Sequence, residues 1–285
     1  MLKYRFTQVL GLLTFALLIL GGLVTSTDSG LAVPDWPLSF GGLFPPMVGG
    51  IRYEHTHRVV AAAVGVLTFL LTIWIGKTES RPGIRWLAIT SLGVVVLQGI
   101  LGGLAVLFRL PPPVSVAHAC LGPVFFCLVT LLASMHSPGW QEAQNGFSSE
   151  REEKRFQLFS GLTVLAAFLQ IILGAIVRHT GVFVWIHVSW AFVVLTLTGF
   201  LVVHSLAHLG DERFVLWPAL FLGFLVTVEF FLGIGAFVFT RIPGIPPGAG
   251  HTIFPTVHQA LGSLILATAV VLALRSRRAT SLVSV

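Results

Sequence analysis

Eight long apolar segments follow one another along this chain of 285 residues. Each is roughly 17–25 residues long, the length that an α-helix needs to cross the hydrocarbon core of a bilayer. Only 10% of the residues are charged, whereas soluble domains carry about 25%. The sequence therefore predicts an all-α integral membrane protein with eight transmembrane helices. The expected spans cover residues 6–24, 55–76, 84–107, 116–136, 156–178, 185–207, 214–239 and 254–274.

The basic residues, which give the chain a net charge of +6, are distributed unevenly between the loops on the two sides of the expected membrane. One side carries twelve lysines and arginines, and the other carries Arg52, Arg109, Arg178 and Arg241. The positive-inside rule then predicts a multi-pass cell-membrane protein with both termini in the cytoplasm. Because the charge follows topology, a nucleic-acid partner is not expected. Residues 1–24 are expected to be a retained first helix, since no A-x-A cleavage site follows them.

The chain is expected to consist of two pseudo-symmetric four-helix bundles, residues 1–140 and 150–285. Between them, residues 137–155 form the longest polar segment and are expected to be a flexible connector. Its EREEK run is expected to be only a solvated run of charges. A repeat in the odd-numbered spans supports two related halves, although generic glycine packing between membrane helices would also explain it. Its copies are LQGILGG (97–103), LQIILGA (169–175), VEFFLGIGA (228–236) and, more loosely, LILGGLV (18–24).

Four of the ten histidines, His57, His118, His187 and His258, lie near the start of the even-numbered spans. Each lies 17–20 residues from the cytoplasmic end of its span, which at 1.5 Å per residue places all four at one depth near the outer edge. Two histidines on facing helices can ligate a heme iron from both sides. We therefore expect His57 with His118, and His187 with His258, to form two heme sites. Hydrogen bonding between helices is the alternative for any single histidine.

Five arginines near the outer side are candidates to bind the anionic heme propionates, because a guanidinium recognises carboxylates well. Snorkelling of the same side chains to lipid headgroups is the alternative. These residues are Arg52, Arg58, Arg109, Arg178 and Arg241.

Glu54 lies three residues before His57 and is expected to share its helix face, with His55 and Arg58 on another face. A carboxylate beside a heme ligand can move protons or stabilise a developing positive charge; an exposed residue in the first helical turn is the alternative. No glutamate directly precedes His187 or His258. One site is therefore expected to react and the other to transfer electrons.

The predicted spans also contain a glutamate and two cysteines. Glu229 takes the repeat position of Gln98 and Gln170 and is expected to be an interhelical carboxyl group, with a proton relay as the alternative. Cys120 and Cys127 lie seven residues apart on one predicted helix, too far for a disulfide. They are expected to be apolar packing residues.

The segment GGLVTSTDSGLAVPDWPLSFGG (21–42), followed by EHTHR (54–58), resembles the heme A synthases, membrane enzymes that convert heme O to heme A. VAHAC, WIHVSW and VHQALG extend the resemblance over nearly the whole chain. It implies an oxidoreductase of heme biosynthesis and cytochrome oxidase assembly. Two successive hydroxylations of one porphyrin methyl group would give a gem-diol, which loses water to leave a formyl group.

The resemblance also assigns roles to residues. The N-terminal half would hold the substrate heme O, with Glu54, His57 and His118 as catalytic residues, and the C-terminal half would hold heme b on His187 and His258. Heme O synthase, an unidentified electron donor and the lipid bilayer are the expected partners, and a homo-oligomer is left open.

The chain departs from this family pattern in its first outer loop. Many bacterial members have two cysteines there, where this chain has Val33 and Ser39, so a loop disulfide is excluded. Pro34, Trp36, Pro37 and the glycines are expected to shape the loop instead. Two other functions stay open: a diheme cytochrome b that passes electrons from quinol without modifying heme, and a transporter with polar residues at mid-membrane, which fits histidines at one membrane edge poorly.

Overall fold

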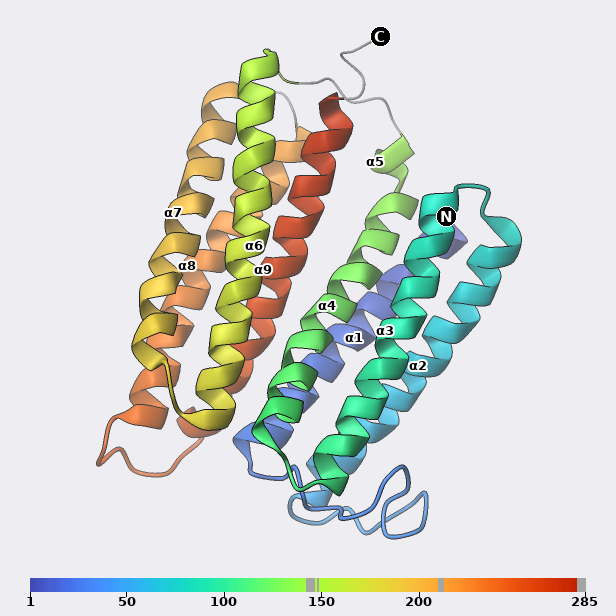
Figure 1. Cartoon of the computed structure of the whole chain (residues 1–285), viewed down its shortest axis with the longest axis vertical. Coiled ribbons are helices and arrows are strands. Elements are labelled where there is room, and N and C mark those ends of the chain that lie inside the picture. The colour runs from blue at the N-terminus through green and yellow to red at the C-terminus, as the bar shows by residue number, and fades with distance from the viewer. Residues whose placement is uncertain (142–146, 148, 210–212, 281–285) are drawn as a thin grey trace. The chain divides into compact units, whose positions relative to one another are not determined.

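The computed structural model describes residues 1–141, 147, 149–209 and 213–280, and its regular elements there are helices, as predicted. Eight of them are long and apolar enough to cross a membrane (Figure 1). Each contains one of the predicted spans and extends a few residues beyond it. The eight helices are α1 (Leu2–Ser26), α2 (Ile51–Thr78), α3 (Pro82–Leu107), α4 (Pro112–His136), α6 (Glu150–Thr180), α7 (Val184–His208), α8 (Arg213–Arg241) and α9 (Gly250–Thr280).

The segment expected to be a flexible connector is helical at both ends. The short helix α5 covers Pro138–Gln141, and α6 begins at Glu150. Ser149 caps α6, because its side-chain oxygen accepts a hydrogen bond from the Glu152 N–H at 3.3 Å and so satisfies one of the free N–H groups of the first turn. The expectation is therefore wrong for these two ends, while residues 142–146 and 148 lie outside the described residues.

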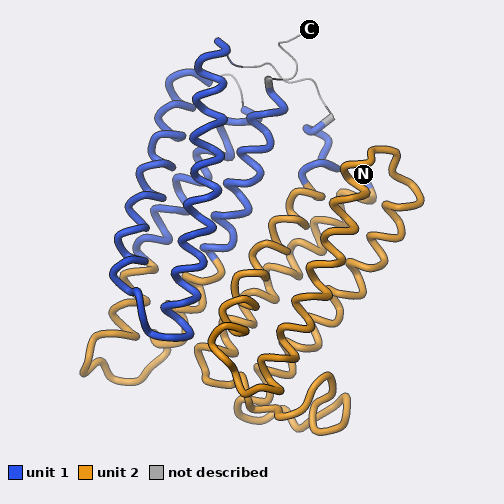
Figure 2. The backbone as a smooth tube through the Cα atoms, in the orientation of Figure 1, with its two compact units in different colours: residues 1, 134–231, 261–285 blue, residues 2–133, 232–260 orange. Residues whose placement is uncertain are grey.

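The chain divides into two compact units, which Figure 2 colours separately. One unit contains residues 2–133 and 232–260, and in it α2 packs against both α1 and α3. The other contains residues 1, 134–231 and 261–285, and in it α6 packs against α7. The assignment of residues 1–140 and 150–285 to two functional halves stays a prediction.

Several threonine hydroxyl groups form hydrogen bonds within their own helix. The side chains of Thr14, Thr68 and Thr163 donate hydrogen bonds of 2.7–2.8 Å to the carbonyl oxygens four residues earlier. A hydroxyl group that bonds within its own helix can be placed in hydrocarbon at little cost. Large apolar side chains such as Trp86 and Trp217 are exposed on the protein surface. A surface of this kind suits contact with lipid chains.

A compact ionic cluster stabilises the turn between α2 and α3. The Glu79 carboxylate accepts hydrogen bonds from Arg81 Nε at 2.9 Å and from Arg81 Nη2 at 3.1 Å. Lys3 Nζ, from α1, lies 3.6 Å from the same carboxylate, and Arg85 donates to the Glu79 carbonyl oxygen. These contacts, led by the hydrogen bonds from Arg81, lower the pKa of Glu79 to about 2. The cluster thus joins the start of α1 to the α2–α3 turn.

The lowered pKa of Glu79 predicts a loss of stability in acid. The stabilisation is complete above the unfolded-state pKa near 4.5 and is lost as the pH falls toward 2, because the unfolded chain then binds the proton first. We expect Glu79→Gln to remove on the order of 1–2 kcal/mol at pH 7, after allowance for solvent screening. The melting temperature of the purified protein at pH 7 and pH 3 measures this effect.

Glu150→Gln is the matched control, because the ion pair of Glu150 with Lys154 is exposed on both sides and such pairs contribute little. A Glu79→Gln variant with the same pH dependence of melting as the natural chain would contradict the assignment.

Candidate functional site

Each of the four histidines at the helix starts packs against a glycine of the preceding long helix. His57 faces Gly21, His118 faces Gly102, His187 faces Gly174 and His258 faces Gly233. A β-carbon at any of these glycines would lie 3.0–3.1 Å from the Cε1 atom of its histidine, which is closer than carbon atoms pack. A side chain at any of these four places would therefore push the imidazole ring aside by a few tenths of an ångström or more.

For three of the four histidines, the residue one turn before the glycine directs a polar group toward the histidine. Gln98 lies four residues before Gly102, and its carbonyl oxygen is 3.2 Å from His118 Nδ1, while its Nε2 donates to the His118 carbonyl oxygen at 2.9 Å. Gln170 lies four residues before Gly174 and donates to the His187 carbonyl oxygen at 3.1 Å. Leu17, four residues before Gly21, directs its carbonyl oxygen toward His57, although outside ordinary hydrogen-bond geometry.

This arrangement suits an axial ligand of a heme iron. At His118, a proton on Nδ1 held by the Gln98 carbonyl oxygen would leave the lone pair of Nε2 for the metal, and such a partner fixes the orientation of the ring. All four histidines are half-buried, so part of each side chain stays open to a bound group. The imidazole donors and the four histidine–glycine contacts, here called glycine cradles, therefore fit a heme ligand at each of the four positions.

The sequence repeat has a structural meaning that sequence reasoning missed. Every copy places a glycine four residues after Leu17, Gln98, Gln170 or Glu229, and this glycine receives the histidine. A β-carbon at Gly262 would lie 3.1 Å from Glu229 Oε1. The fixed offset between the glycine and the residue one turn earlier was the signal that could have revealed the histidine partners.

His57 and His118 lie in one compact unit, close enough for a charge on one ring to act on the other. Their assignment to one substrate heme stays a prediction. His187 and His258 belong to different units, and each ring is placed against its own glycine within its unit. Their assignment to one heme b stays a prediction.

Glu54 is buried, with 3% of its surface exposed, so the alternative of an exposed first-turn residue is excluded. Its Oε1 atom lies 2.5 Å from Arg58 Nη2, and its Oε2 atom accepts a hydrogen bond from the Val33 N–H at 2.8 Å. The expectation that Arg58 lies on another helix face is wrong, because residues four apart are neighbours on a helix surface. Both carboxylate oxygens are therefore engaged one turn from His57.

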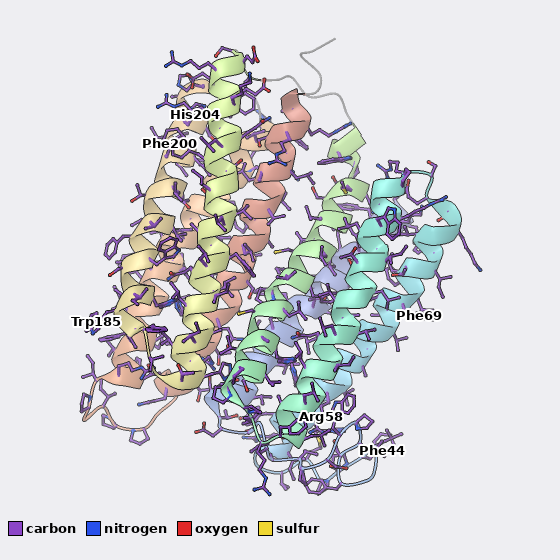
Figure 3. All side chains as sticks on the ribbon, viewed as in Figure 1. Phe44, Arg58, Phe69, Trp185, Phe200 and His204 are labelled. Atoms are coloured by element: carbon purple, nitrogen blue, oxygen red, sulfur yellow. The ribbon has the colours of Figure 1, made fainter. Side chains whose placement is uncertain are left out.

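Arg58 holds the outer loop, residues 27–50, against the start of α2. Its guanidinium donates hydrogen bonds to the carbonyl oxygens of Asp35 at 2.6 Å, Leu38 at 2.8 Å and Val33 at 3.1 Å. Figure 3 labels Arg58 beside this loop. Since these contacts and Glu54 engage both terminal nitrogens, Arg58 in this structure anchors the loop. A contact with a heme propionate stays a prediction for this residue.

Other residues complete the fold of the loop. The Asp35 carboxylate accepts hydrogen bonds from the N–H groups of Gly41 and Phe40 at 2.7 and 2.8 Å, which hold the pKa of Asp35 below its usual range. Ser39 Oγ lies 2.9 Å from His55 Nδ1. The Trp36 ring packs on α3 at Gly103, where a β-carbon would lie 2.7 Å from the Trp36 Cδ2 atom. The loop is thus held by Arg58 and by contacts that need no cysteine.

The remaining arginines of the predicted set are placed as follows. Arg52 is exposed, donates to the Tyr53 hydroxyl oxygen at 3.0 Å and stacks on its ring. Arg109 and Arg241 are exposed at the ends of α3 and α8, and Arg178 is half-buried in the last turn of α6. Their role as propionate contacts stays a prediction.

The cysteines behave as expected from the sequence. Both are free thiols, with Cys127 buried and Cys120 half-buried on α4. No disulfide joins them, and they lie among the packing residues of their helix.

Comparison with known proteins supports the resemblance that the sequence shows. The family model described as "Cytochrome oxidase assembly protein" matches residues 51–184, which include Glu54, His57 and His118. The chain is 31% identical over 175 residues to the heme A synthase of Shouchella clausii, and the match covers 57% of this chain and 54% of the relative. It is 34% identical over 167 residues to the heme A synthase of Symbiobacterium thermophilum, covering 56% and 54%.

A third relative, the heme A synthase of Bacillus pumilus, is 30% identical over 186 residues, with 63% of this chain and 60% of the relative covered. The chain thus spans a little over half the length of the curated relatives that it matches. Fold and site define an eight-span helical membrane protein with glycine-cradled histidines. Its predicted resemblance to the heme A synthases is confirmed by these similarities.

The glycine cradles predict a specific effect of added side chains. Gly102→Val and Gly174→Val place methyl groups where the rings of His118 and His187 lie, so we expect each variant to lose most of the heme held by its histidine. Gly99→Val and Gly161→Val are matched controls on the same two helices, because nothing lies within 4 Å of a β-carbon there. Heme per protein, measured from the absorption of the purified variants, checks this prediction. Equal heme content in a variant and its control would contradict the cradle.

Proposed function

We propose that this chain is a heme A synthase, an oxidoreductase that converts one methyl group of heme O to the formyl group of heme A. The observation that supports the proposal best is the buried Glu54 one turn from His57, under a loop held by Arg58. Four glycine-cradled histidines and the similarity to curated heme A synthases agree with it. Because the chain spans little more than half of those relatives, the activity, the substrate and the partners are all part of the proposal.

The substrate heme O would be held by His57 and His118, and the resident heme b by His187 and His258. Two hydroxylations convert the methyl carbon to an alcohol and then to a gem-diol, and loss of water leaves the formyl group. Each hydroxylation would be a two-electron oxidation of the carbon with dioxygen as co-reactant. One oxygen atom would enter the C–H bond, and the other would leave as water with two electrons from the external donor and two protons. Heme b, held by His187 and His258, would carry these electrons one at a time.

Glu54 is proposed to act as a fixed negative charge beside the substrate. Its two oxygens are held by Arg58 and by the Val33 N–H, so the carboxylate needs no rearrangement to stabilise positive charge that develops on the porphyrin. A proton transfer through Glu54 would first have to open one of these two contacts. Electrostatic stabilisation is therefore the role that the geometry favours.

The cellular setting is part of the same proposal. Heme O synthase would supply the substrate, since that enzyme makes heme O, and a separate electron donor would exchange electrons with heme b. The chain would lie in the cell membrane with both termini in the cytoplasm, which places the four histidines near the outer face. Twelve lysines and arginines on the proposed cytoplasmic side support this orientation.

The role of Glu54 predicts which pigment accumulates in a host that makes heme O. The natural chain should yield heme A, whereas Glu54→Gln should reduce heme A by at least about 100-fold while heme b stays bound. Glu150→Gln is the control, because the Glu150 carboxylate is exposed and forms its ion pair with Lys154. Extraction and chromatography of the hemes measure the result. Normal heme A from Glu54→Gln would rule out the proposed role.

The diheme cytochrome b stays the second candidate, because the four histidine cradles alone would serve it equally well. It requires heme O to remain unchanged with both the natural chain and Glu54→Gln. His258→Ala tests the resident heme: we expect the low-spin heme b absorption of the purified protein to disappear. Retention of that absorption would contradict the assignment of His258.

The proposed orientation predicts the behaviour of reporter fusions. A reporter that is active only in the cytoplasm should be active when it is fused after the C-terminus or in the loop between α2 and α3. The same reporter should be inactive in the loop between α3 and α4. The opposite pattern would reverse the topology.

A further inference from the structure

A cluster of metal-binding side chains lies at the end of the α6–α7 hairpin that is remote from His187. It consists of Glu152 in the first turn of α6 and His204 and His208 in the last turns of α7. Figure 3 labels His204 and Phe200 at this end of the hairpin, with Trp185 at the other end. His204 lies 17 residues after His187, roughly 26 Å along the helix. The cluster is therefore separate from the heme-ligand end of the same helix.

The spacing of the cluster suits one ion. His204 and His208 are four residues apart on α7, so both imidazoles lie on one helix face. One ligand atom from each of the three residues lies within 4.8 Å of the other two. His204 Nδ1 and Glu152 Oε2 are 3.5 Å apart. This exceeds the usual length of an N–H···O hydrogen bond and is close to the roughly 3.3 Å between two ligands bound to one zinc ion at 2.0–2.1 Å.

His204 is more deeply buried than a histidine in a surface ion pair has to be. It is 6% exposed, and the rings of Phe156 and Phe200 lie 5.5 and 5.6 Å from its ring centroid. Its Nε2 atom is buried without a hydrogen-bond partner in the described residues. Aromatic packing thus fixes the ring toward Glu152, and one of its nitrogens is left uncommitted.

The other two ligands provide access and charge. His208 is exposed, and its ring centroid lies 4.7 Å from that of His204, so an ion can enter from the solvent side. The Glu152 side chain is 23% exposed and supplies one negative charge. Arg155 stacks over the Phe200 ring, with its guanidinium carbon 5.7 Å from the ring centroid. Two imidazoles with one carboxylate exclude magnesium and calcium, which prefer oxygen ligands, and suit zinc.

We propose that Glu152, His204 and His208 form a zinc site, with water as the fourth ligand. A bound Zn²⁺ links the first turn of α6 to the last turn of α7 and so stabilises the hairpin that carries His187. The three ligand atoms lie within 4.8 Å of one another, so they would draw together by up to about 1.5 Å to reach the roughly 3.3 Å between two ligands of one zinc ion. This inference does not depend on the proposed heme chemistry.

Metal titration of the full-length, heme-loaded protein in detergent tests the site. After chelator treatment and removal of the chelator, Zn²⁺ is titrated against a chromophoric competitor. We expect one equivalent of Zn²⁺ to bind to the natural chain and to raise its melting temperature. His204→Ala and His208→Ala should lose this equivalent, and Glu152→Gln should bind at least tenfold more weakly, since even residues that only support a ligand can cost this much.

Glu153→Gln is the matched control, because Glu153 is the neighbouring carboxylate on α6 and lies outside the cluster. It should bind Zn²⁺ as the natural chain does. His204 is buried, so the far-UV circular dichroism of each variant verifies folding, and the exposed His208 keeps the test decisive if His204→Ala does not fold. No Zn²⁺ bound by the natural chain, or equal binding in Glu152→Gln, His208→Ala and Glu153→Gln, would overturn the proposal and leave a simple histidine–glutamate pair.

Discussion

The contact between an imidazole ring and a glycine on the preceding helix recurs at the four positions that matter most in this molecule. Apolar side chains gain little by leaving lipid for a helix surface, so close packing through small residues is a main source of helix association in membranes. Here the same close approach also places a histidine. Gly102 with His118 shows both effects, because Gln98, one turn earlier, bonds to the same residue through its backbone carbonyl and its side-chain amide. Helix packing and ligand placement therefore have one cause.

The outer loop depends on a second interaction, the buried pair of Glu54 and Arg58. Breaking a buried ion pair by removing one partner typically costs about 3–5 kcal/mol, because the other charge is left without compensation. Arg58 also donates to three loop carbonyls, so the same charge organises the loop backbone beside the start of α2. The loop then needs no covalent bridge. Val33 is fully buried and Ser39 bonds to His55, so both positions have a structural use of their own.

Much of the fold follows from periodic features of the sequence. The eight spans are set by hydrophobic length, and the register of His57 with His118 follows from counting residues at a fixed rise. The features that the sequence did not predict depend on where side chains point in space. The side chain of Arg58 turns toward Glu54 and the loop, as the spacing of four residues allows, although it was expected on another face with His55. Likewise, the start of α6 at Glu150 is decided by the cap at Ser149, which a charge-rich segment conceals. Which glycine faces which histidine depends on how two helices pack together, and the sequence alone does not give that packing.

The adjacent glycines 102 and 103 of α3 serve two different rings. Gly102 receives the imidazole of His118, and Gly103 receives the indole of Trp36 from the outer loop. Successive residues of an α-helix point about 100° apart, so the two rings press on different flanks of α3. Rotation of α3 about its own axis, which a lipid environment resists only weakly, would drive one of the two rings into the helix backbone. The two glycine contacts therefore fix the rotation of α3 about its own axis, and they link this rotation to the position of the loop.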